Sequence, residues 1–377
     1  MSAEPSIDAV ALAQKIAALL DSAVFDTTYK LSTLEALIDL VSSSIGESGT
    51  PRESFSAREV SSRVLHRYWS QTANFGTAGT GSHSFLRQRS GGQGGDLVSR
   101  IAQARIELSL TSHADTLVSA RKRWPEVIKK LEDLAWERVV DMPLPRLQRF
   151  GGGGGSQGYE DRFIYDYKWG AEGEKKHLAL ARKDDTISLK DGVGRGLVAL
   201  QPLLRRHIEI LWLHLVADWN PNLTDAGRLR VALFGSQRQA NKSLANPLAE
   251  LQNGQCFYCG EIFGKSIEVD HFLPWSLSRN DNIENLVVAC PSCNGKKSDS
   301  LASLPYLEAW RQRVFESSLV REALAELAEK FARVYDPHST LGQARGLYLY
   351  APAAQPLWSF QSDHNPLDKQ AAATLLL

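Results

Sequence analysis

The chain of 377 residues is long enough for two or three domains, and its 43% hydrophobic and 23% charged residues are ordinary for a soluble globular protein. Its 43 basic residues balance 43 acidic ones, so any binding of nucleic acid must rest on local patches of charge. The sequence starts without a signal peptide pattern and has no stretch of roughly 18 apolar residues, so we expect a cytoplasmic protein without a membrane partner.

Most of the first 150 residues are predicted to form helices. Residues 6–24, 29–44 and 56–69 place Ala, Leu, Ile and Val at spacings of three and four, which is the pattern of an amphipathic helix. Residues 96–109 repeat this pattern and open on Asp96, a residue type that caps helices. We interpret residues 1–150 as a helical domain that senses a substrate or a partner.

A further amphipathic helix is predicted over residues 119–140, ended by the prolines of the segment DMPLPRL. Residues 121–149 contain eight Lys or Arg against five Asp or Glu, a balance of +3. This mild excess fits either a solvated helix face or a surface that contacts phosphates, and the sequence leaves both interpretations open.

The segment GGGGGSQG at residues 151–158 is the clearest low-complexity stretch, and we interpret it as a linker or loop between two domains. After it, residues 162–169 and 186–193 are rich in β-forming residues and predict a hairpin. Residues 197–220 predict one long, largely buried helix. Residues 159–377 would then form a second domain of mixed structure.

The second domain contains the stretch of the chain with the largest excess of basic over acidic residues, and we expect this stretch to approach a polyanion. Its basic residues are Arg228, Arg230, Arg238 and Lys242. Further on, residues 318–335 predict a strong amphipathic helix. Residues 346–352 and 356–360 are candidate strands that would pair with residues 162–169.

The four cysteines of the chain form two C-x-x-C pairs, with thirty residues between Cys259 and Cys290. In a reducing compartment such pairs are more typical of a metal site than of disulfides. Each pair supplies two thiolates from one tight turn, which matches the tetrahedral ligand set of one structural zinc ion. The expected ligands are Cys256, Cys259, Cys290 and Cys293. Because such a site is coordinatively closed, any chemistry must lie between the pairs.

Between the two cysteine pairs the sequence predicts a hairpin followed by a short helix. Residues 267–270 alternate apolar with acidic side chains, as in a strand with one buried face, and this strand ends at Asp270 and His271. Residues 285–289 predict the returning strand. The helix is expected to begin near Asn294 and to carry Lys296 and Lys297.

The cysteine pairs, the segment VDHFLPWS and the segment ENLVVACPSCNGKKSD together resemble the HNH endonuclease family, over about residues 253–301. The resemblance implies a ββα-metal fold with an Asp-His pair closing the first strand, an Asn in the loop, and a His or Asn at the helix start. The expected fold class is therefore α+β, with a mostly helical N-terminal domain and a mixed nuclease domain that carries a zinc-clamped HNH module.

Carried over to this sequence, the family pattern implies that His271 is the general base that deprotonates the attacking water. Asp270 and Asn294 would hold one divalent cation, and Asn285 would brace the loop that orients the histidine. The third position is Asn294 where many members have histidine, but an amide oxygen is a competent ligand for Mg²⁺ or Mn²⁺.

Each of these residues also has a simpler interpretation. Asp270 could bind turn amides at a strand end, and His271 alone would more often be an ordinary packing or surface histidine. Asn285 and Asn294 could be turn and cap residues. Their occurrence together and in this order, inside a zinc-clamped frame, favours the catalytic interpretation.

The charge of the cysteine region indicates that DNA contacts come from elsewhere. Residues 256–300 contain four basic against six acidic residues, and zinc-bound thiolates add further negative charge. We expect residues 228–242 or 121–149 to supply phosphate contacts, with binding that weakens as salt rises. Lys296 and Lys297 are either solvated helix charges or further contacts to the nucleic-acid backbone.

The leading hypothesis is thus a metal-dependent endonuclease that nicks or cleaves DNA. A catalytically silent zinc module for nucleic-acid or protein binding is the alternative, and the ββα site does not exclude RNA as the substrate. The resemblance also suggests a role in restriction or anti-phage defence, with protein partners of such a system.

Overall fold

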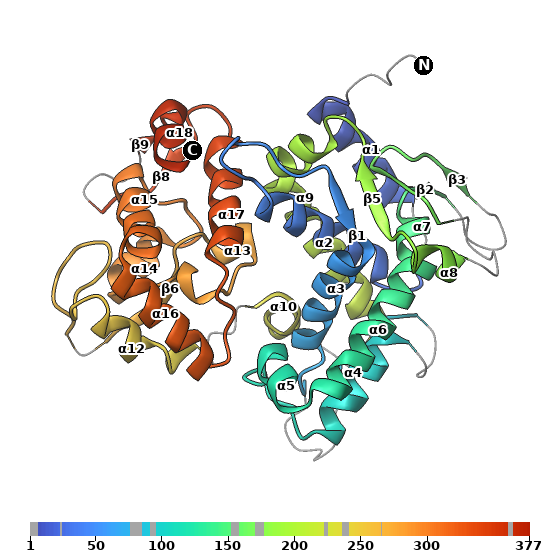
Figure 1. The fold of residues 1–377 in the computed structure, drawn as a ribbon, viewed down its shortest axis with the longest axis horizontal. Coiled ribbons are helices and arrows are strands. Elements are labelled where there is room, and N and C mark those ends of the chain that lie inside the picture. The colour runs from blue at the N-terminus through green and yellow to red at the C-terminus, as the bar shows by residue number, and fades with distance from the viewer. Residues whose placement is uncertain are drawn as a thin grey trace. The chain divides into compact units, whose positions relative to one another are not determined.

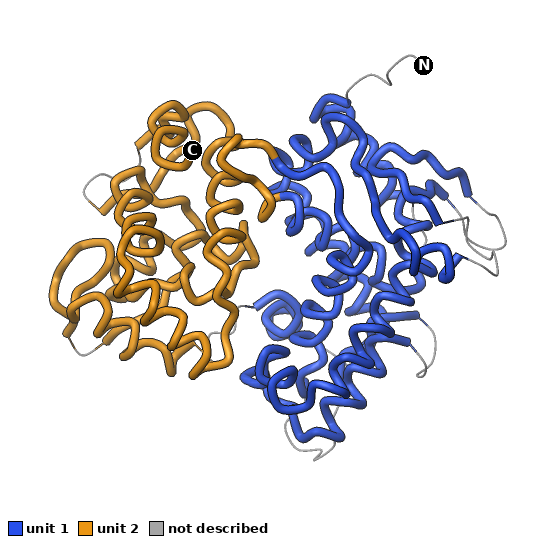
Figure 2. The backbone as a smooth tube through the Cα atoms, in the orientation of Figure 1, with its two compact units in different colours: residues 1–41, 51–235 blue, residues 42–50, 236–377 orange. Residues whose placement is uncertain are grey.

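The structure is a computed structural model, and it divides into two compact units. The residues that it describes are 7–22, 25–75, 85–90, 96–151, 158–169, 177–221, 225–235, 241–264, 266–360 and 365–377. Unit 1 comprises Met1–Val41 and Pro51–Gly235, and unit 2 comprises Ser42–Thr50 and Ser236–Leu377 (Figure 2).

Unit 1 is mostly helical, as expected for the N-terminal part of the chain (Figure 1). Its described helices are α1 (Ala9–Ser22), α2 (Tyr29–Ser43, whose last two residues belong to unit 2), α3 (Ala57–Gln71), α4 (Leu97–Glu107), α5 (Leu117–Arg123), α6 (Pro125–Asp141), α7 (Pro143–Leu147), α8 (His177–Ala181), α9 (Val193–Trp219) and α10 (Ala226–Phe234). Helix α3 packs along α6, and α1 packs along α9.

The strands of unit 1 explain why the expected boundary near residue 150 differs from the observed division. Strand β5 (Thr186–Leu189) lies between β1 (Ser54–Ser56) and β4 (Tyr165–Tyr167), antiparallel to both. Phe55 and Tyr167 both pair with Ile187. This sheet joins segments from both sides of residue 150, so the division lies near residue 235 instead.

The glycine-rich segment also lies inside unit 1. Its flanks are the paired strands β2 (Arg149–Phe150) and β3 (Tyr159–Glu160), in which Phe150 pairs with Tyr159. The linker predicted at residues 151–158 is therefore enclosed by a strand pair, although residues 152–157 themselves lie outside the described part of the chain. The predicted pairing of residues 162–169 with 186–193 is confirmed by β4 and β5.

The helix predicted over residues 119–140 is divided at a proline. Helix α5 ends at Arg123, and α6 begins with Pro125 in its first position. Trp124 between them has φ −135° and ψ 61°, because proline disfavours helical geometry in the preceding residue. Asp96 caps α4 as expected, accepting a hydrogen bond from the backbone N–H of Ser99 at 2.7 Å.

Charged residues are buried in the interior of unit 1. Arg67 contacts Glu35 at 2.6 Å and Asp39 at 2.9 Å, and Arg205 contacts Asp39 at 2.6 Å. Burial alone would raise the pKa of the Asp39 carboxyl, but the charges of Arg205 and Arg67 lower it below its usual range. The three ion pairs tie α2 to α3 and α9.

Unit 2 contains the expected hairpin and helix among further helices (Figure 1). Its described elements are α12 (Ala245–Glu250), β6 (Glu268–His271), α13 (Trp275–Ser278), η1 (Ile283–Asn285), β7 (Leu286–Ala289), α14 (Pro291–Lys297), α15 (Leu304–Arg311), η2 (Gln312–Glu316), α16 (Ser318–Lys330), α17 (Pro337–Leu349), β8 (Pro356–Leu357), β9 (Asn365–Pro366) and α18 (Lys369–Leu376). The mixture of helices and small sheets agrees with the predicted fold class.

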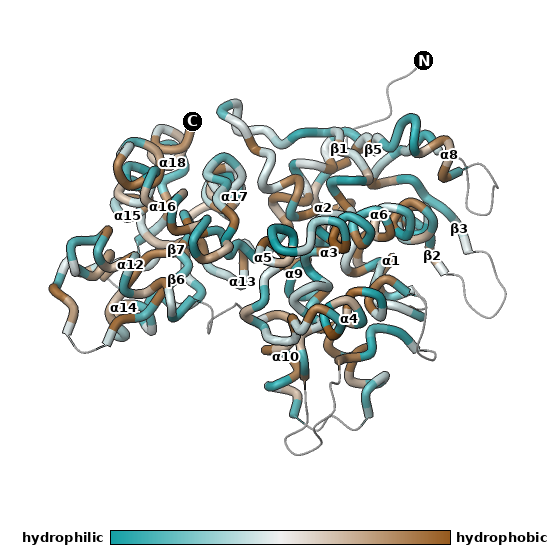
Figure 3. The backbone as a smooth tube through the Cα atoms, turned by 60° about the horizontal axis from the view of Figure 1, so that its bottom comes forward, coloured by the Kyte–Doolittle hydropathy of each residue, from teal (hydrophilic) through white to brown (hydrophobic). Residues whose placement is uncertain are grey.

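Strand β7 is the centre of the unit 2 core, because all four of its residues are buried. Val287 and Ala289 belong to a hydrophobic cluster with Phe272 and Trp310, whose rings stack at 4.9 Å. The residues on the other face of the strand join a second cluster with α12 and α16. Figure 3 shows hydrophilic and hydrophobic residues mixed along the helices of the protein. On α16 the buried residues Leu324 and Ala328 belong to this second cluster, so the apolar side of the helix covers the strand.

The candidate strands near the C-terminus are corrected by the structure. Residues 346–349 end helix α17, which begins with Pro337 and is capped by Asp336 through a 3.1 Å hydrogen bond from Ser339 N–H. The side chain of Tyr348 is buried in the hydrophobic cluster, where a helix suits it as well as a strand. Residues 356–357 form β8, which pairs with β9 in unit 2 and not with β4.

No helix in the described ranges of the chain is both long and apolar enough to cross a membrane.

Candidate active site and metal centre

The four cysteine side chains form one cluster in unit 2. The Sγ atoms of Cys256, Cys259, Cys290 and Cys293 all lie within 4.8 Å of one another. Gly260 has φ 72°, which favours glycine, and it closes the first turn by donating its N–H to the carbonyl of Cys256 at 3.0 Å. Cys290 occupies the position directly before α14, and Cys293 lies in the first turn of that helix.

The cluster fits a structural zinc ion. A tetrahedral zinc ion binds thiolates at about 2.3 Å, which places the sulfurs about 3.8 Å apart. Burial alone would raise the pKa of the Cys256 thiol, but hydrogen bonds from the backbone N–H groups of Cys259 and Cys290 contribute to lowering it. Burial raises the pKa of the Cys293 thiol, and so do its sulfur neighbours. A divalent cation would relieve this crowding of sulfurs by stabilising all four thiolates.

His271 is held at the end of β6 by the strand ladder and by an aspartate. Its backbone pairs with Leu286 of β7, and its Nε2 lies 2.8 Å from Oδ1 of Asp281. The imidazole is 10% exposed. When Nε2–H donates to Asp281, the neutral ring keeps its lone pair on Nδ1, and this nitrogen can accept a proton.

Asp281 is itself fixed by residues from distant parts of the sequence. Arg333 donates to its Oδ2 at 2.6 Å, and Asn241 donates to its Oδ1 at 3.2 Å. Burial alone would raise the pKa of the Asp281 carboxyl, but the hydrogen bond from His271 and the charge of Arg333 lower it. Asp281 is therefore an ionised acceptor that orients the imidazole.

Asn285 is fully buried and joins the two ends of the loop between the strands. Its Oδ1 accepts from the N–H of Leu273 at 2.8 Å. Its Nδ2 donates to the carbonyls of Leu273 at 3.1 Å and Asn280 at 2.9 Å. This geometry suits the bracing role expected for Asn285, because the loop begins directly after His271.

Asp270 lies in the interior beside two hydrogen-bond donors that the sequence did not reveal. Its Oδ2 accepts from the hydroxyl of Tyr258 at 2.6 Å and lies 3.0 Å from Nζ of Lys297. Burial, followed by the charge of Asp270, raises the pKa of Tyr258 well above its usual value, so the hydroxyl keeps its proton and donates it.

The position of Lys297 corrects an expectation. Lys297 was expected at the surface, as a solvated helix charge or a contact to nucleic acid, but its side chain is fully buried. Besides Asp270, it donates to the carbonyl of His271 at 2.9 Å. Lys297 therefore holds the end of β6 against α14, and its charge is compensated inside the protein.

Asn294 lies near Glu268, an acidic residue outside the predicted site. Its Nδ2 donates to Oε2 of Glu268 at 2.6 Å. Glu268 and Asp270 lie two positions apart on β6, so their side chains project from the same face of the strand. Helix α14 begins at Pro291 and not near Asn294, because proline is favoured in the first helical position, so Asn294 lies one turn into the helix.

The donor set suits a hard divalent cation. Asp270 offers a carboxylate oxygen and Asn294 an amide oxygen, which are ligand types preferred by Mg²⁺ and Mn²⁺. Glu268 adds a second carboxylate on the same face of β6, within reach of Asn294.

The basic residues predicted to contact nucleic acid are distributed over both units. Arg228 donates to the carbonyl of Phe75 at 2.8 Å, and Arg230 donates to Glu209 at 2.6 Å. Lys242 and Lys296 are exposed residues of unit 2. Arg238 lies outside the described residues.

A comparison with protein-family models identifies the segment that carries this geometry. The model of the HNH endonuclease family matches residues 256–300. This segment is an HNH endonuclease domain. It spans the cysteine cluster, the β6–β7 hairpin and α14. Searches of curated proteins and of solved structures gave no match to the chain.

The HNH domain depends on residues that sequence reasoning missed. Asp281 lies ten positions after His271. Because the loop between the two strands is irregular, this spacing does not predict that the two side chains meet. Arg333 and Asn241 lie outside the matched segment, so only the fold brings them to Asp281. Tyr258 lies inside the first C-x-x-C turn, and its hydrogen bond to Asp270 has no signal in the sequence.

Proposed function

We propose that this protein is a metal-dependent endonuclease that hydrolyses phosphodiester bonds in DNA. The observation that carries the proposal is the hydrogen-bonded chain from Arg333 through Asp281 to His271. Asp281, His271 and the neighbouring Asp270 lie in the segment that matches the HNH endonuclease family. A module used only for binding has no need of an imidazole oriented in this way.

In this proposal His271 is the general base. Its Nδ1 accepts a proton from the attacking water while Nε2–H stays bonded to Asp281, which stabilises the imidazolium that forms. Histidine suits this role because it titrates near neutral pH. Asn285 keeps the loop after His271 in place, so the imidazole is oriented before substrate binds.

Asp270 and Asn294 would hold one Mg²⁺ or Mn²⁺ ion. When bound, such an ion supplies a Lewis acid for the phosphate and a template for the leaving oxygen. Lys297 and Tyr258 orient the Asp270 carboxylate through its Oδ2. The four cysteines would hold a separate zinc ion that supports α14 against the hairpin without taking part in the reaction.

The DNA backbone would be contacted by exposed basic side chains. Lys296 lies two positions after Asn294 on α14 and is the nearest candidate in sequence. Lys242 of unit 2 and, separately, Arg228 and Arg230 of unit 1 are further exposed candidates. Arg238 stays a candidate from the sequence alone, because it lies outside the described residues. Such binding is expected to weaken steeply as salt rises. For biological context we propose restriction or anti-phage defence in the cytoplasm, on the basis of the HNH domain that the chain carries.

A cleavage assay tests the proposal. Zinc-loaded protein is incubated with supercoiled plasmid or with RNA, in Mg²⁺, in Mn²⁺ or without an added divalent ion. We expect nicked or linear plasmid only when Mg²⁺ or Mn²⁺ is present, and the ratio of the two products reports whether one or both strands are cut. Cleavage of RNA alone would contradict the assignment of the substrate, and binding of DNA without any cleavage would favour the silent module.

A further inference from the structure

The two C-x-x-C pairs each send one hydrogen-bond donor to the Asp270 carboxylate. Its Oδ2 accepts from the hydroxyl of Tyr258 at 2.6 Å and lies 3.0 Å from Nζ of Lys297. Tyr258 lies inside the first cysteine pair, and Lys297 is the last residue of α14, the helix that contains Cys293 of the second pair. Both donors therefore meet at one oxygen, although they come from opposite halves of the cysteine cluster.

The second oxygen of this carboxylate remains for a cation. Oδ1 of Asp270 has no hydrogen-bond partner among the residues that the structure describes. Two donors on Oδ2 restrict the rotation of the carboxylate, so they also fix the direction of Oδ1. A Mg²⁺ or Mn²⁺ ion held by few protein ligands depends strongly on how each of them is oriented.

Tyr258 has little freedom to move within its turn. Its buried ring meets the rings of Tyr306 and Trp358 edge to face, at centroid distances of 5.4 Å and 5.1 Å. Cys259 follows Tyr258 directly, and its Sγ lies within 4.8 Å of the sulfurs of the second pair. A metal ion that joins the four sulfurs would therefore hold the Tyr258 turn and α14 together, and with them both donors to Asp270.

We propose that the cysteine cluster, when it holds zinc, raises the affinity of the Asp270 site for its divalent cation, with Tyr258 and Lys297 as the positioning residues that carry the effect. This coupling rests on the proposed function, which assigns Asp270 to that cation. Because coupling between two binding sites is reciprocal, each ion then favours binding of the other.

A Mn²⁺ titration of the zinc-loaded, full-length protein without nucleic acid tests the role of Tyr258. Electron paramagnetic resonance reports free Mn²⁺, and Asp270→Asn identifies the site that is lost. Loss of a residue that orients a metal ligand costs about 10- to 100-fold in metal affinity. We therefore expect Tyr258→Phe to bind Mn²⁺ at least about tenfold more weakly and to keep its zinc, since Lys297 still compensates the charge of Asp270.

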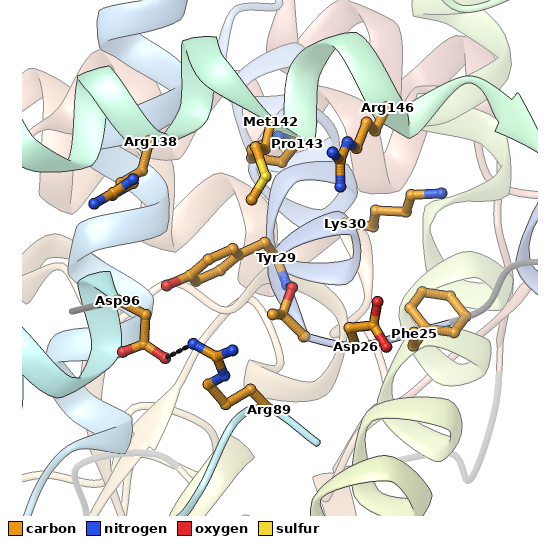
Figure 4. Close-up of a pocket in the computed structure, with 11 residues that line it drawn as sticks. Phe25, Asp26, Tyr29, Lys30, Arg89, Asp96, Arg138, Met142, Pro143 and Arg146 are labelled. Atoms are coloured by element: carbon orange, nitrogen blue, oxygen red, sulfur yellow. Dashed lines mark hydrogen bonds and ion pairs between the residues drawn. The ribbon is translucent and has the colours of Figure 1, made fainter. Parts of the chain in front are cut away.

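Two other tyrosines are matched controls for the loss of a hydroxyl. Tyr306 belongs to the same aromatic cluster, but its hydroxyl accepts from the N–H of Phe360 at 3.4 Å. Tyr29 lines a cavity of about 440 Å³ in unit 1, where its hydroxyl points toward Asp96 (Figure 4) and accepts from the N–H of Leu97 at 2.9 Å. Tyr306→Phe and Tyr29→Phe should both bind Mn²⁺ as the wild type does.

Reciprocity gives a second measurement, which does not require a cysteine variant to fold. Zinc affinity is measured by competition with a zinc-selective chelator, with and without saturating Mg²⁺. Mg²⁺ should raise the zinc affinity of the wild type and should have a smaller effect in Tyr258→Phe. An equal effect in both proteins, or no effect in the wild type, would overturn the coupling.

The outcomes of the Mn²⁺ titration separate this coupling from the proposed function. If the wild type binds Mn²⁺ no better than Asp270→Asn does, the cation site itself is wrong, and the coupling is wrong with it. If Mn²⁺ binds at Asp270 with equal affinity in the wild type and in Tyr258→Phe, the cation site stands and the coupling through Tyr258 is refuted.

Discussion

Lys297 and Lys296 are neighbours in the sequence with opposite environments. Lys297 is fully buried against Asp270, and Lys296 is exposed. Replacing Lys297 by Met leaves the Asp270 carboxylate without its cation, so we expect Lys297→Met to lower the free energy of unfolding by about 3–5 kcal/mol. Lys296→Met should change it by less than about 0.5 kcal/mol. Urea unfolding of the zinc-loaded protein measures both, and equal effects would refute the buried ion pair.

Asp281 supports a second prediction at this scale. Because it orients His271 without touching the reacting phosphate, Asp281→Asn should slow DNA cleavage about 10²- to 10⁴-fold and leave the dissociation constant for DNA unchanged. Asp299→Asn, at an exposed aspartate beyond α14, serves as the control and should cleave like the wild type. An Asp281→Asn variant with full activity would show that the hydrogen bond has no part in the reaction.

At the scale of elements, the η1 turn carries a buried acid beside Asn285. Burial raises the pKa of Glu284 to about 7, although Thr340 donates to its Oε1 at 2.5 Å. The folded protein thus holds a proton that the unfolded chain releases at lower pH, so this contribution to stability is full below pH of about 4.5 and is lost as pH rises through about 7. Relative to Glu284→Gln, the wild type should lose about 3 kcal/mol over that window.

Unfolding by urea at pH 5 and at pH 8 measures this difference for both proteins. The glutamine variant is the control, because its amide oxygen can still accept from Thr340 and it does not titrate. Parallel changes in the two proteins would contradict the assignment of the pH dependence to Glu284.

The cysteine cluster joins the first turn of the HNH domain to α14. We expect about one zinc ion per chain, and we expect Cys259→Ser to lose that zinc and to make unit 2 unfold at lower temperature. Zinc analysis and thermal unfolding measure the two effects, with Ser292→Ala, at an exposed position of α14, as the control. Full zinc content in Cys259→Ser would show that the four thiols do not act as one site.

How far the sequence predicts these elements depends on whether their signal is local. The hairpin and α14 were predictable, because strand alternation, a proline and two cysteine turns all lie within fifty residues. The signal for the break at Pro125 is also local, but the helical periodicity on both sides of the proline predicts one continuous helix. The helical form of residues 346–349 was not predictable, because its aromatic residues suit either structure and the cap at Asp336 lies ten residues earlier.

At the scale of the whole molecule, the division into two units depends on contacts between distant segments of the chain. The same holds for the residues that fix Asp281 in the candidate site. Because β1 pairs with β5, segments on both sides of residue 150 belong to one unit, and the division lies near residue 235. No local sequence pattern reveals this pairing. Likewise Arg333 and Asn241 reach Asp281 from 52 and 40 positions away in the sequence. The clustering of the four cysteines was predictable, because their spacing is local, whereas Arg333 and Asn241 were not. The roles of His271 and Asp270 stay predictions.

The central claim is that His271 is the general base of a nuclease. The most direct measurement is the single-turnover rate of plasmid cleavage in Mg²⁺ for the wild type, His271→Ala and His338→Ala, with zinc content determined for each. His338 is an exposed histidine on α17 and serves as the matched control. We predict that His271→Ala cleaves at least about 10²-fold more slowly with zinc retained, while His338→Ala matches the wild type. Wild-type rates in His271→Ala would contradict the account.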